Sequence, residues 1–266
     1  MSKAIALGIT GVAVSFAMLA AGFLAGNGSA LNAAPQGAGE APSLARVVSR
    51  NDVEEIVRDY LLRNPEILTD MQAELEDRQR EEQRLALLDA IGTSSDAIFN
   101  AAYDGVVGNP QGTTTVVEFF DYNCGFCKRA YADMTAMVAE DPDLRFVLKE
   151  FPILGPDSQK AHIVSMAFRT LAPEKYGAFH TALLNGSRAT EATAIAAALS
   201  FGVDEAALRE EMKNPAIADA FGETYELAQQ LAITGTPSYV VGQEVVFGAL
   251  GKAVLKEKVE LARAQD

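Results

Sequence analysis

The hydrophobic positions between residues 51 and 91 recur with the 3.6-residue period of an amphipathic helix. Apolar side chains mark one face at Val53, Ile56, Val57, Tyr60, Leu61, Ile67, Leu68, Met71 and Leu75. Asn64-Pro65 interrupts the pattern, and because proline is tolerated in the first turn of a helix, we expect a second helix to start there. Residues 76–84 are all charged or amide, as on a solvated helix face. This arm, 51–92, has too few apolar positions to fold alone, so it must pack on its own domain or on other copies of the chain.

Strand patterns begin after the arm. Val106-Val107, before the turn residues Gly108-Asn109-Pro110, predicts a short strand. Residues 113–120 (TTTVVEFF) are β-branched and aromatic, which is typical of a buried strand. Helical composition follows at 130–139, and a second strand pattern at 144–151. This strand–helix–strand order predicts two parallel strands joined by a right-handed crossover.

The segment from about 157 to 233 contains no strand pattern. It is rich in alanine and helix-periodic, so we expect four or five helices inserted before the sheet resumes. Residues 238–241 and 244–247 flank Gly242-Gln243, which predicts a β-hairpin, and residues 249–263 predict a closing helix. The fold class is therefore α/β, with a helical insertion and an N-terminal helical arm.

The N-terminus has the pattern of a targeting segment. Lys3 precedes an apolar run at 4–24, and Gly28-Ser29-Ala30 supplies small residues for cleavage, so we interpret 1–30 as a signal peptide. The run is nearly long enough to span a bilayer, so an uncleaved anchor is the alternative. Residues 31–50, rich in Ala, Gly and Pro, are interpreted as a linker. Whether the segment is a cleaved signal peptide or an uncleaved anchor, we expect the rest of the chain to be exported to a compartment where disulfides persist.

Composition excludes several classes of protein. With 49% hydrophobic and 22% charged residues the chain is globular, and its net charge of −14 argues against a nucleic-acid partner. Two cysteines exclude a multi-disulfide scaffold and, without a second pair, a zinc ribbon. We expect both histidines, His162 and His180, to be core or helix-surface residues and not metal ligands.

The two cysteines, Cys124 and Cys127, lie between a predicted buried strand and a predicted helix. A cysteine at a helix N-terminus is stabilised as a thiolate by unpaired backbone N–H groups and the helix dipole, and the thiolate is the nucleophile. We therefore predict Cys124 as nucleophile and Cys127 as resolving thiol. A plain structural disulfide is disfavoured because so short a loop constrains the unfolded chain very little.

Glu118 is the only charged residue in its predicted strand. Burial raises the pKa of a carboxyl group, so Glu118 is a candidate to exchange protons with the nearby thiols. Lys149 lies in the next predicted strand, which is largely apolar, and is a candidate partner for Glu118. The alternative is that either side chain reaches solvent.

Three segments in combination resemble the DsbA-like thioredoxin family, nearest in character to its ScsC and Com1-like branch. They are residues 119–128 (FFDYNCGFCK), 149–155 (KEFPILG) and 235–238 (GTPS). The resemblance covers residues 93–266 and implies a thioredoxin fold interrupted by a helical domain, a redox-active disulfide and cysteine-containing protein substrates. It also implies a periplasmic location, a membrane redox partner and no bound organic cofactor, because cysteine sulfur carries the electrons.

The resemblance further implies that the Thr236–Pro237 bond is cis, faces the cysteine pair and offers backbone hydrogen bonds to a substrate peptide. Gly125 and Phe126, between the cysteines, complete the predicted substrate-binding set with Thr236 and Pro237. The familiar strong oxidase of this family has Pro-His at the central dipeptide. Because that dipeptide tunes the reduction potential, a highly oxidising value does not transfer to this chain.

Two questions of function stay open at the level of sequence. The arm resembles that of ScsC-like members, some of which oligomerise through it, and an oligomer (a trimer) would suit disulfide isomerisation, whereas a monomer would suit dithiol oxidation. A different class of function is Cu(I) binding by the two thiolates in copper tolerance, although no Met or His lies beside the pair.

Overall fold

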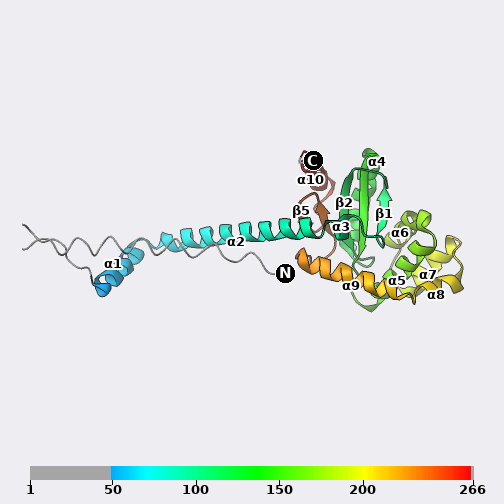
Figure 1. Ribbon diagram of the computed structural model, residues 1–266, viewed down its shortest axis with the longest axis horizontal. Coiled ribbons are helices and arrows are strands. Elements are labelled where there is room, and N and C mark those ends of the chain that lie inside the picture. The colour runs from blue at the N-terminus through cyan, green and yellow to red at the C-terminus, as the bar shows by residue number, and fades with distance from the viewer. Residues whose placement is uncertain (1–48, 265–266) are drawn as a thin grey trace, which may run out of the picture. The chain divides into compact units, whose positions relative to one another are not determined.

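The computed structural model describes residues 49–264, so the predicted signal peptide and nearly all of the predicted linker lie outside the described residues. The chain divides into two compact units, residues 1–64 and 65–266. Figure 1 follows the elements along the chain. The helices before the sheet are α1 (Arg50–Arg63), α2 (Glu66–Thr93) and α3 (Ser95–Phe99). Over the described residues, every helix is too short or too polar to serve as a bilayer span.

The first unit contains α1, whose start is fixed by its own side chains. Ser49 accepts a hydrogen bond from the backbone of Asp52, and Asp52 accepts one from the backbone of Ser49, a reciprocal capping box. No residue of α1 is buried. In the second unit, Ile91 is the only buried residue of α2, and it packs on the domain that follows. Apart from Ile67, which is half-buried, the apolar stripe predicted for the arm is therefore exposed in both helices.

The sheet has five strands in the order β1-β3-β2-β4-β5. They are β1 (Gly105–Gly108), β2 (Thr114–Phe120), β3 (Leu144–Glu150), β4 (Ser238–Val241) and β5 (Glu244–Phe247). β2 and β3 are parallel, whereas all other pairs are antiparallel. Helix α4 (Gly125–Glu140) connects β2 to β3, which confirms the strand–helix–strand unit, and β4 and β5 confirm the predicted hairpin.

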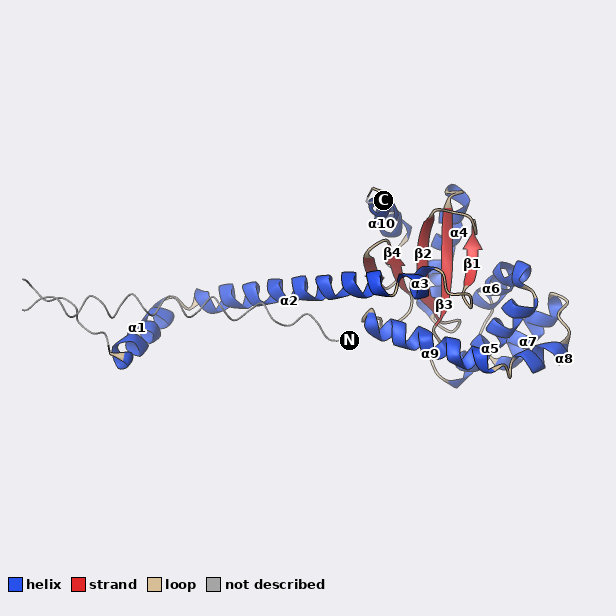
Figure 2. Cartoon of the chain, viewed as in Figure 1, coloured by secondary structure: helices blue, strands red, loops and turns tan. Residues whose placement is uncertain are grey.

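The helices between β3 and β4 confirm the expected insertion. They are α5 (Pro156–Leu171), the short 3-10 helix η1 (Pro173–Lys175), α6 (Tyr176–Asn185), α7 (Glu191–Ser200), α8 (Glu205–Glu211) and α9 (Pro215–Gln230). Figure 2 shows α5 to α8 gathered at the side of the sheet that carries β1, which α6 contacts. The closing helix is α10 (Lys252–Arg263). This arrangement is a thioredoxin fold with inserted helices and an N-terminal helical region.

Strand alternation divides the core between the two faces of the sheet. On one face, Val116 and Phe120 of β2 join a cluster with residues of α4, α5 and α10. On the other face, Val117 and Phe119 join Ile98 of α3 and residues of α9. Glu118 therefore belongs to the face covered by α4, whose first turn carries the cysteine pair.

Candidate functional site

The turn between β2 and α4 is held by hydrogen bonds that its first residue, Asp121, accepts. Asp121 is fully buried, and its side chain accepts from the backbone N–H groups of Asn123 (2.8 Å) and Leu154 (3.0 Å). Its backbone carbonyl accepts from the N–H of Cys124 (2.9 Å). Cys124 is thereby placed as the N-cap residue of α4, as the sequence predicts.

The sulfur of Cys124 lies among hydrogen-bond partners. Its Sγ accepts from the backbone N–H of Cys127 (3.4 Å) and, as a thiol, donates to the carbonyl oxygen of Thr236 (3.1 Å). The Cys127 thiol, the side chain of Thr236 and the N–H groups of the first helical turn together outweigh burial and lower the pKa of Cys124 to about 5. Cys124 is thus a thiolate at neutral pH.

Cys127 has the opposite character. It is 1% exposed, and burial, followed by its contact with Cys124 and the charge of Glu118, raises the pKa of its thiol. Both cysteines are free thiols in this structure. The pair therefore combines one ionised, nucleophilic sulfur with one protonated sulfur, which is the asymmetry that stepwise disulfide exchange requires.

The Thr236–Pro237 peptide bond is cis, as expected. Pro237 immediately precedes β4 and is buried, and its carbonyl accepts from the N–H of Gly248 (2.9 Å). Because the Thr236 carbonyl contacts Cys124 Sγ, the structure brings this loop and the cysteine pair together.

Glu118 also lies at the cysteine pair. It is 4% exposed and faces Tyr239 of β4 in the strand register. Burial, followed by the negative charge of Cys124, raises the pKa of Glu118 to about 8, against a smaller opposing effect of Tyr239. A carboxyl group with this pKa can both donate and accept a proton near neutral pH.

The expected pairing of Lys149 with Glu118 is wrong. In the parallel register Lys149 lies opposite Phe119, so its side chain points to the face of the sheet away from Glu118. There its ammonium group donates to Asp104 Oδ2 (2.5 Å) and to the carbonyl of Ala97. Lys149 closes a buried ion pair on the α3 side and does not contact the cysteines.

Gly125 and Phe126 lie at the surface beside the pair. Phe126 is 58% exposed, and the Arg129 guanidinium lies 4.3 Å from the centroid of its ring. Lys128 donates to the carbonyl of Gly186 (2.8 Å) and to that of Ser187, joining α4 to the loop after α6. An exposed aromatic ring next to a nucleophilic sulfur can contact a bound polypeptide.

A buried polar network behind the turn was missed by sequence reasoning. Glu150, at the end of β3, accepts from Ser165 (2.6 Å) and Tyr176 (3.1 Å) and contacts the ring of His162. His162 is fully buried, which confirms it as a core histidine. The available signal was Glu150 itself, a charged residue at the end of a largely apolar strand, but its partners lie on helices that follow later in the sequence.

No group of three or more His, Cys, Asp or Glu side chains suited to a metal occurs within residues 49–264. His180, like His162, is buried and hydrogen-bonded, its Nδ1 lying 3.2 Å from the Tyr122 hydroxyl. With both histidines engaged in this way, the copper-binding alternative is not favoured.

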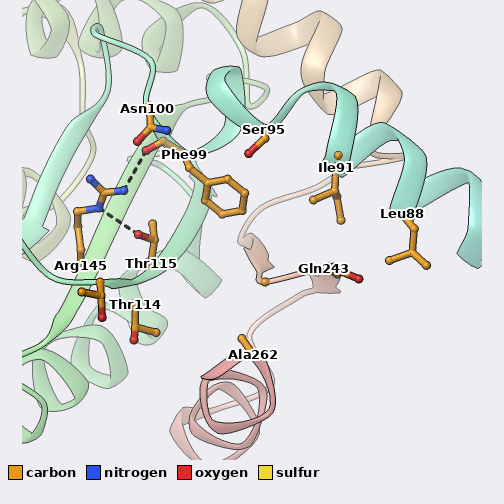
Figure 3. A pocket seen from close by; sticks show the side chains of 13 residues that line it. Leu88, Ile91, Ser95, Phe99, Asn100, Thr114, Thr115, Arg145, Gln243 and Ala262 are labelled. Atoms are coloured by element: carbon orange, nitrogen blue, oxygen red, sulfur yellow. Dashed lines mark hydrogen bonds between the residues drawn. The ribbon is translucent and has the colours of Figure 1, made fainter. Parts of the chain in front are cut away.

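The structure also has a cavity of about 480 Å³ at the other end of the sheet from the cysteines. It lies between α2, α3, the β4–β5 turn and α10 (Figure 3). Arg145 is one of the residues that line the cavity, and its guanidinium group donates to the Thr115 hydroxyl (3.1 Å) and to the Phe99 carbonyl (3.2 Å). Since neither cysteine lines it, this cavity is separate from the candidate site.

Comparison with known proteins assigns the family. The sequence pattern of the DSBA-like thioredoxin domain matches residues 115–260, and that of the copper resistance protein ScsC N-terminal domain matches residues 50–82. The chain is 24% identical over 166 residues to disulfide bond formation protein D of Bacillus subtilis (strain 168), covering 58% of this chain and 75% of that protein.

Two solved structures are also similar. A thioredoxin-like oxidoreductase from Silicibacter pomeroyi DSS-3 is 40% identical, covers 64% of this chain and 97% of its own, and superposes with a TM-score of 0.60. Proteus mirabilis ScsC in a transitional conformation is 25% identical, covers 85% of this chain and 100% of its own, and has a TM-score of 0.60. The chain therefore belongs to the DSBA-like thioredoxin domain family, whose members are thiol–disulfide oxidoreductases.

Proposed function

We propose that this protein is an exported thiol–disulfide oxidoreductase that acts on cysteines of envelope proteins through Cys124 and Cys127. The observation that carries the proposal is the contrast between the two sulfurs. Cys124, at the start of α4, has its pKa lowered to about 5, whereas burial raises the pKa of Cys127. The Cys124 thiolate can attack a disulfide, whereas the Cys127 thiol stays protonated until the mixed disulfide is resolved.

In the proposed reaction, the Cys124 thiolate attacks one sulfur of a substrate disulfide. A Cys124–substrate disulfide forms, the substrate S–S bond breaks, and the leaving thiolate takes up a proton. Cys127 then loses its proton, with ionised Glu118 as acceptor, and attacks Cys124 Sγ. The substrate dithiol is released and the Cys124–Cys127 disulfide remains; the reverse sequence oxidises a substrate dithiol. In isomerisation, a second substrate thiolate resolves the mixed disulfide and restores Cys124.

Thr236, Pro237, Gly125 and Phe126 are the proposed substrate-binding residues. The Thr236 carbonyl lies 3.1 Å from Cys124 Sγ, so a substrate strand laid beside this loop would present its own backbone close to Cys124 Sγ. Phe126 would contact substrate side chains through its exposed ring. Main-chain recognition of this kind suits an enzyme that accepts many protein substrates.

We also propose that the arm assembles the chain into a homo-oligomer, a trimer, and that a membrane protein renews the redox state of the pair. The support for assembly is the exposed apolar stripe on α1 and α2. Its exposed members are Val53, Ile56, Val57, Tyr60, Leu61, Leu68, Met71 and Leu75. An exposed apolar face on each helix is typical of an interaction surface. A trimer would hold several cysteine pairs around one substrate and favour isomerisation, whereas a monomer would favour oxidation.

Replacement of Cys124 by Ser tests the proposed function. The variant and the wild-type protein are compared in the reactivation of a ribonuclease with scrambled disulfides, in glutathione buffer. We expect Cys124→Ser to abolish catalysis, because serine does not attack disulfides, and Cys127→Ser to retain the first attack. Undiminished turnover by Cys124→Ser would contradict the proposal.

A further inference from the structure

The ring of His162 connects the turn that carries Cys124 to the buried carboxylate of Glu150. Its Nε2 accepts a hydrogen bond from the backbone N–H of Tyr122 (3.1 Å), and its Nδ1 contacts Glu150 Oε2. Because a backbone N–H only donates, Nε2 must be unprotonated in this arrangement. With the proton on Nδ1, which donates to Glu150, these two contacts are those of a neutral ring.

This contact completes the hydrogen bonding of the turn. Three successive backbone N–H groups point to protein acceptors: Tyr122 to His162, Asn123 to the Asp121 side chain, and Cys124 to the Asp121 carbonyl. Two of the three acceptors belong to Asp121, within the turn. The third comes from α5, so His162 is the only one of these acceptors supplied by the inserted helices.

The Glu150 carboxylate is itself anchored on both oxygens. Oε1 accepts from the hydroxyls of Ser165 and Tyr176, and Oε2 faces His162. The tautomer of His162 is thus set by a rigid partner, as in other sites where a carboxylate orients an imidazole.

We propose that His162 is a positioning residue for the redox reaction: in its neutral form with the proton on Nδ1, it holds the backbone of the turn so that Cys124 stays at the N-cap of α4. It touches neither sulfur and acts through Tyr122. The proposal rests on the use of Cys124 as the nucleophile, but it assigns a role to a residue that the exchange chemistry does not itself require.

Protonation of His162 would disrupt this arrangement. A proton on Nε2 would face the Tyr122 N–H, and the ring would turn toward Asp121 Oδ1, now 3.9 Å from Nε2. Burial lowers the pKa of His162, but Glu150 and Asp121 outweigh it and raise that pKa above its usual value. The titratable groups facing the ring are Asp121 and Tyr122 from the turn, Glu150 from β3 and His180 from α6. Tyr176, also from α6, donates to the Glu150 carboxylate.

Nitrogen-15 NMR of the full chain tests the tautomer directly, because the chain has only two histidines and a His180→Gln variant assigns their signals. Long-range proton–nitrogen spectra are recorded on the reduced protein from pH 5 to pH 10. We expect the neutral form of His162 to carry its proton on Nδ1. A neutral form with the proton on Nε2, or a ring protonated on both nitrogens throughout, would overturn the proposal.

Two substitutions separate the two contacts. In His162→Gln the side-chain oxygen lies near the position of Nε2 and can accept a hydrogen bond from the Tyr122 N–H. In His162→Asn the side-chain amide lies near the position of Nδ1, so it can form a hydrogen bond with Glu150 but not with Tyr122. Thiolate absorbance of the reduced proteins gives the ionisation constant of Cys124. We expect His162→Asn to weaken that ionisation about tenfold, one unit of pKa, and His162→Gln to leave it within about twofold.

A buried substitution elsewhere controls for lost stability. Leu208, fully buried in α8, is replaced by Ala, which lowers stability without touching the turn. If His162→Asn, His162→Gln and Leu208→Ala change the ionisation of Cys124 equally, the role of His162 is merely structural and the proposal is wrong. The NMR spectra and the thiolate titration need no substrate. An absence of exchange activity would therefore contradict the proposed function without contradicting the role of His162.

Discussion

Replacing Glu118 with Gln should make the reduced protein less sensitive to rising pH. The pKa of Glu118 is raised from 4.5 to about 8 in the folded protein, chiefly by burial. Between these values the folded chain keeps a proton that the unfolded chain has lost, so the stability linked to this group is complete below about pH 4.5 and disappears as pH rises to about 8. At about 1.4 kcal/mol per pH unit, the effect has an upper limit of about 5 kcal/mol.

Urea unfolding, followed by circular dichroism, measures this effect. Wild type and Glu118→Gln are kept reduced and compared at each pH from 5 to 8. Cys124 titrates in both proteins, and its charge interaction with Glu118 is part of the difference that is measured. We expect the variant to gain about 2–4 kcal/mol relative to wild type over these three pH units. Glu257→Gln, at an exposed position on α10, is the matched control and should show no such gain. A constant difference between Glu118→Gln and wild type would refute the reasoning.

Three further predictions follow from the contacts of the cysteines, of Lys149 and of the arm. Cys127→Ala removes the thiol that does most to lower the pKa of Cys124, so the thiolate absorbance of Cys124 should titrate well above the wild-type value of about 5; an unchanged midpoint would contradict this. Lys149→Met leaves Asp104 buried and uncompensated, so urea unfolding should show a loss of about 3–5 kcal/mol, partly restored by adding Asp104→Asn, with the Cys124 titration unchanged. Deletion of residues 49–82, which spares the buried end of α2, should convert an oligomer into a monomer by light scattering; a monomeric full-length chain would remove the proposed assembly role.

Local patterns were sufficient to predict the strands and the helix that carries the cysteines. β-Branched and aromatic residues identified β2, and turn residues between two short apolar runs identified the β4–β5 hairpin with its observed bounds. The placement of Cys124 at a helix start also followed from sequence, because a buried strand and a helix flank it directly. These features depend on neighbours in the chain.

The errors and omissions concern contacts between distant segments. Glu118 and Lys149 were expected to pair because both interrupt apolar strands, but the register that places Lys149 opposite Phe119 is a property of the assembled sheet. The network of Glu150 and His162 joins β3 to α5, and no local signal links those positions. One-residue differences in register reverse the face of every side chain, so pairings across a sheet are poorly determined by sequence alone.

The central claim is that Cys124, and not Cys127, attacks substrate disulfides. The most direct test is to incubate reduced Cys127→Ser with a peptide containing one disulfide, quench with acid, and locate the mixed disulfide by mass spectrometry. The account predicts a peptide adduct on Cys124 in Cys127→Ser and none on Cys127 in the reciprocal Cys124→Ser variant. An adduct that forms on Cys127 at a comparable rate would contradict it.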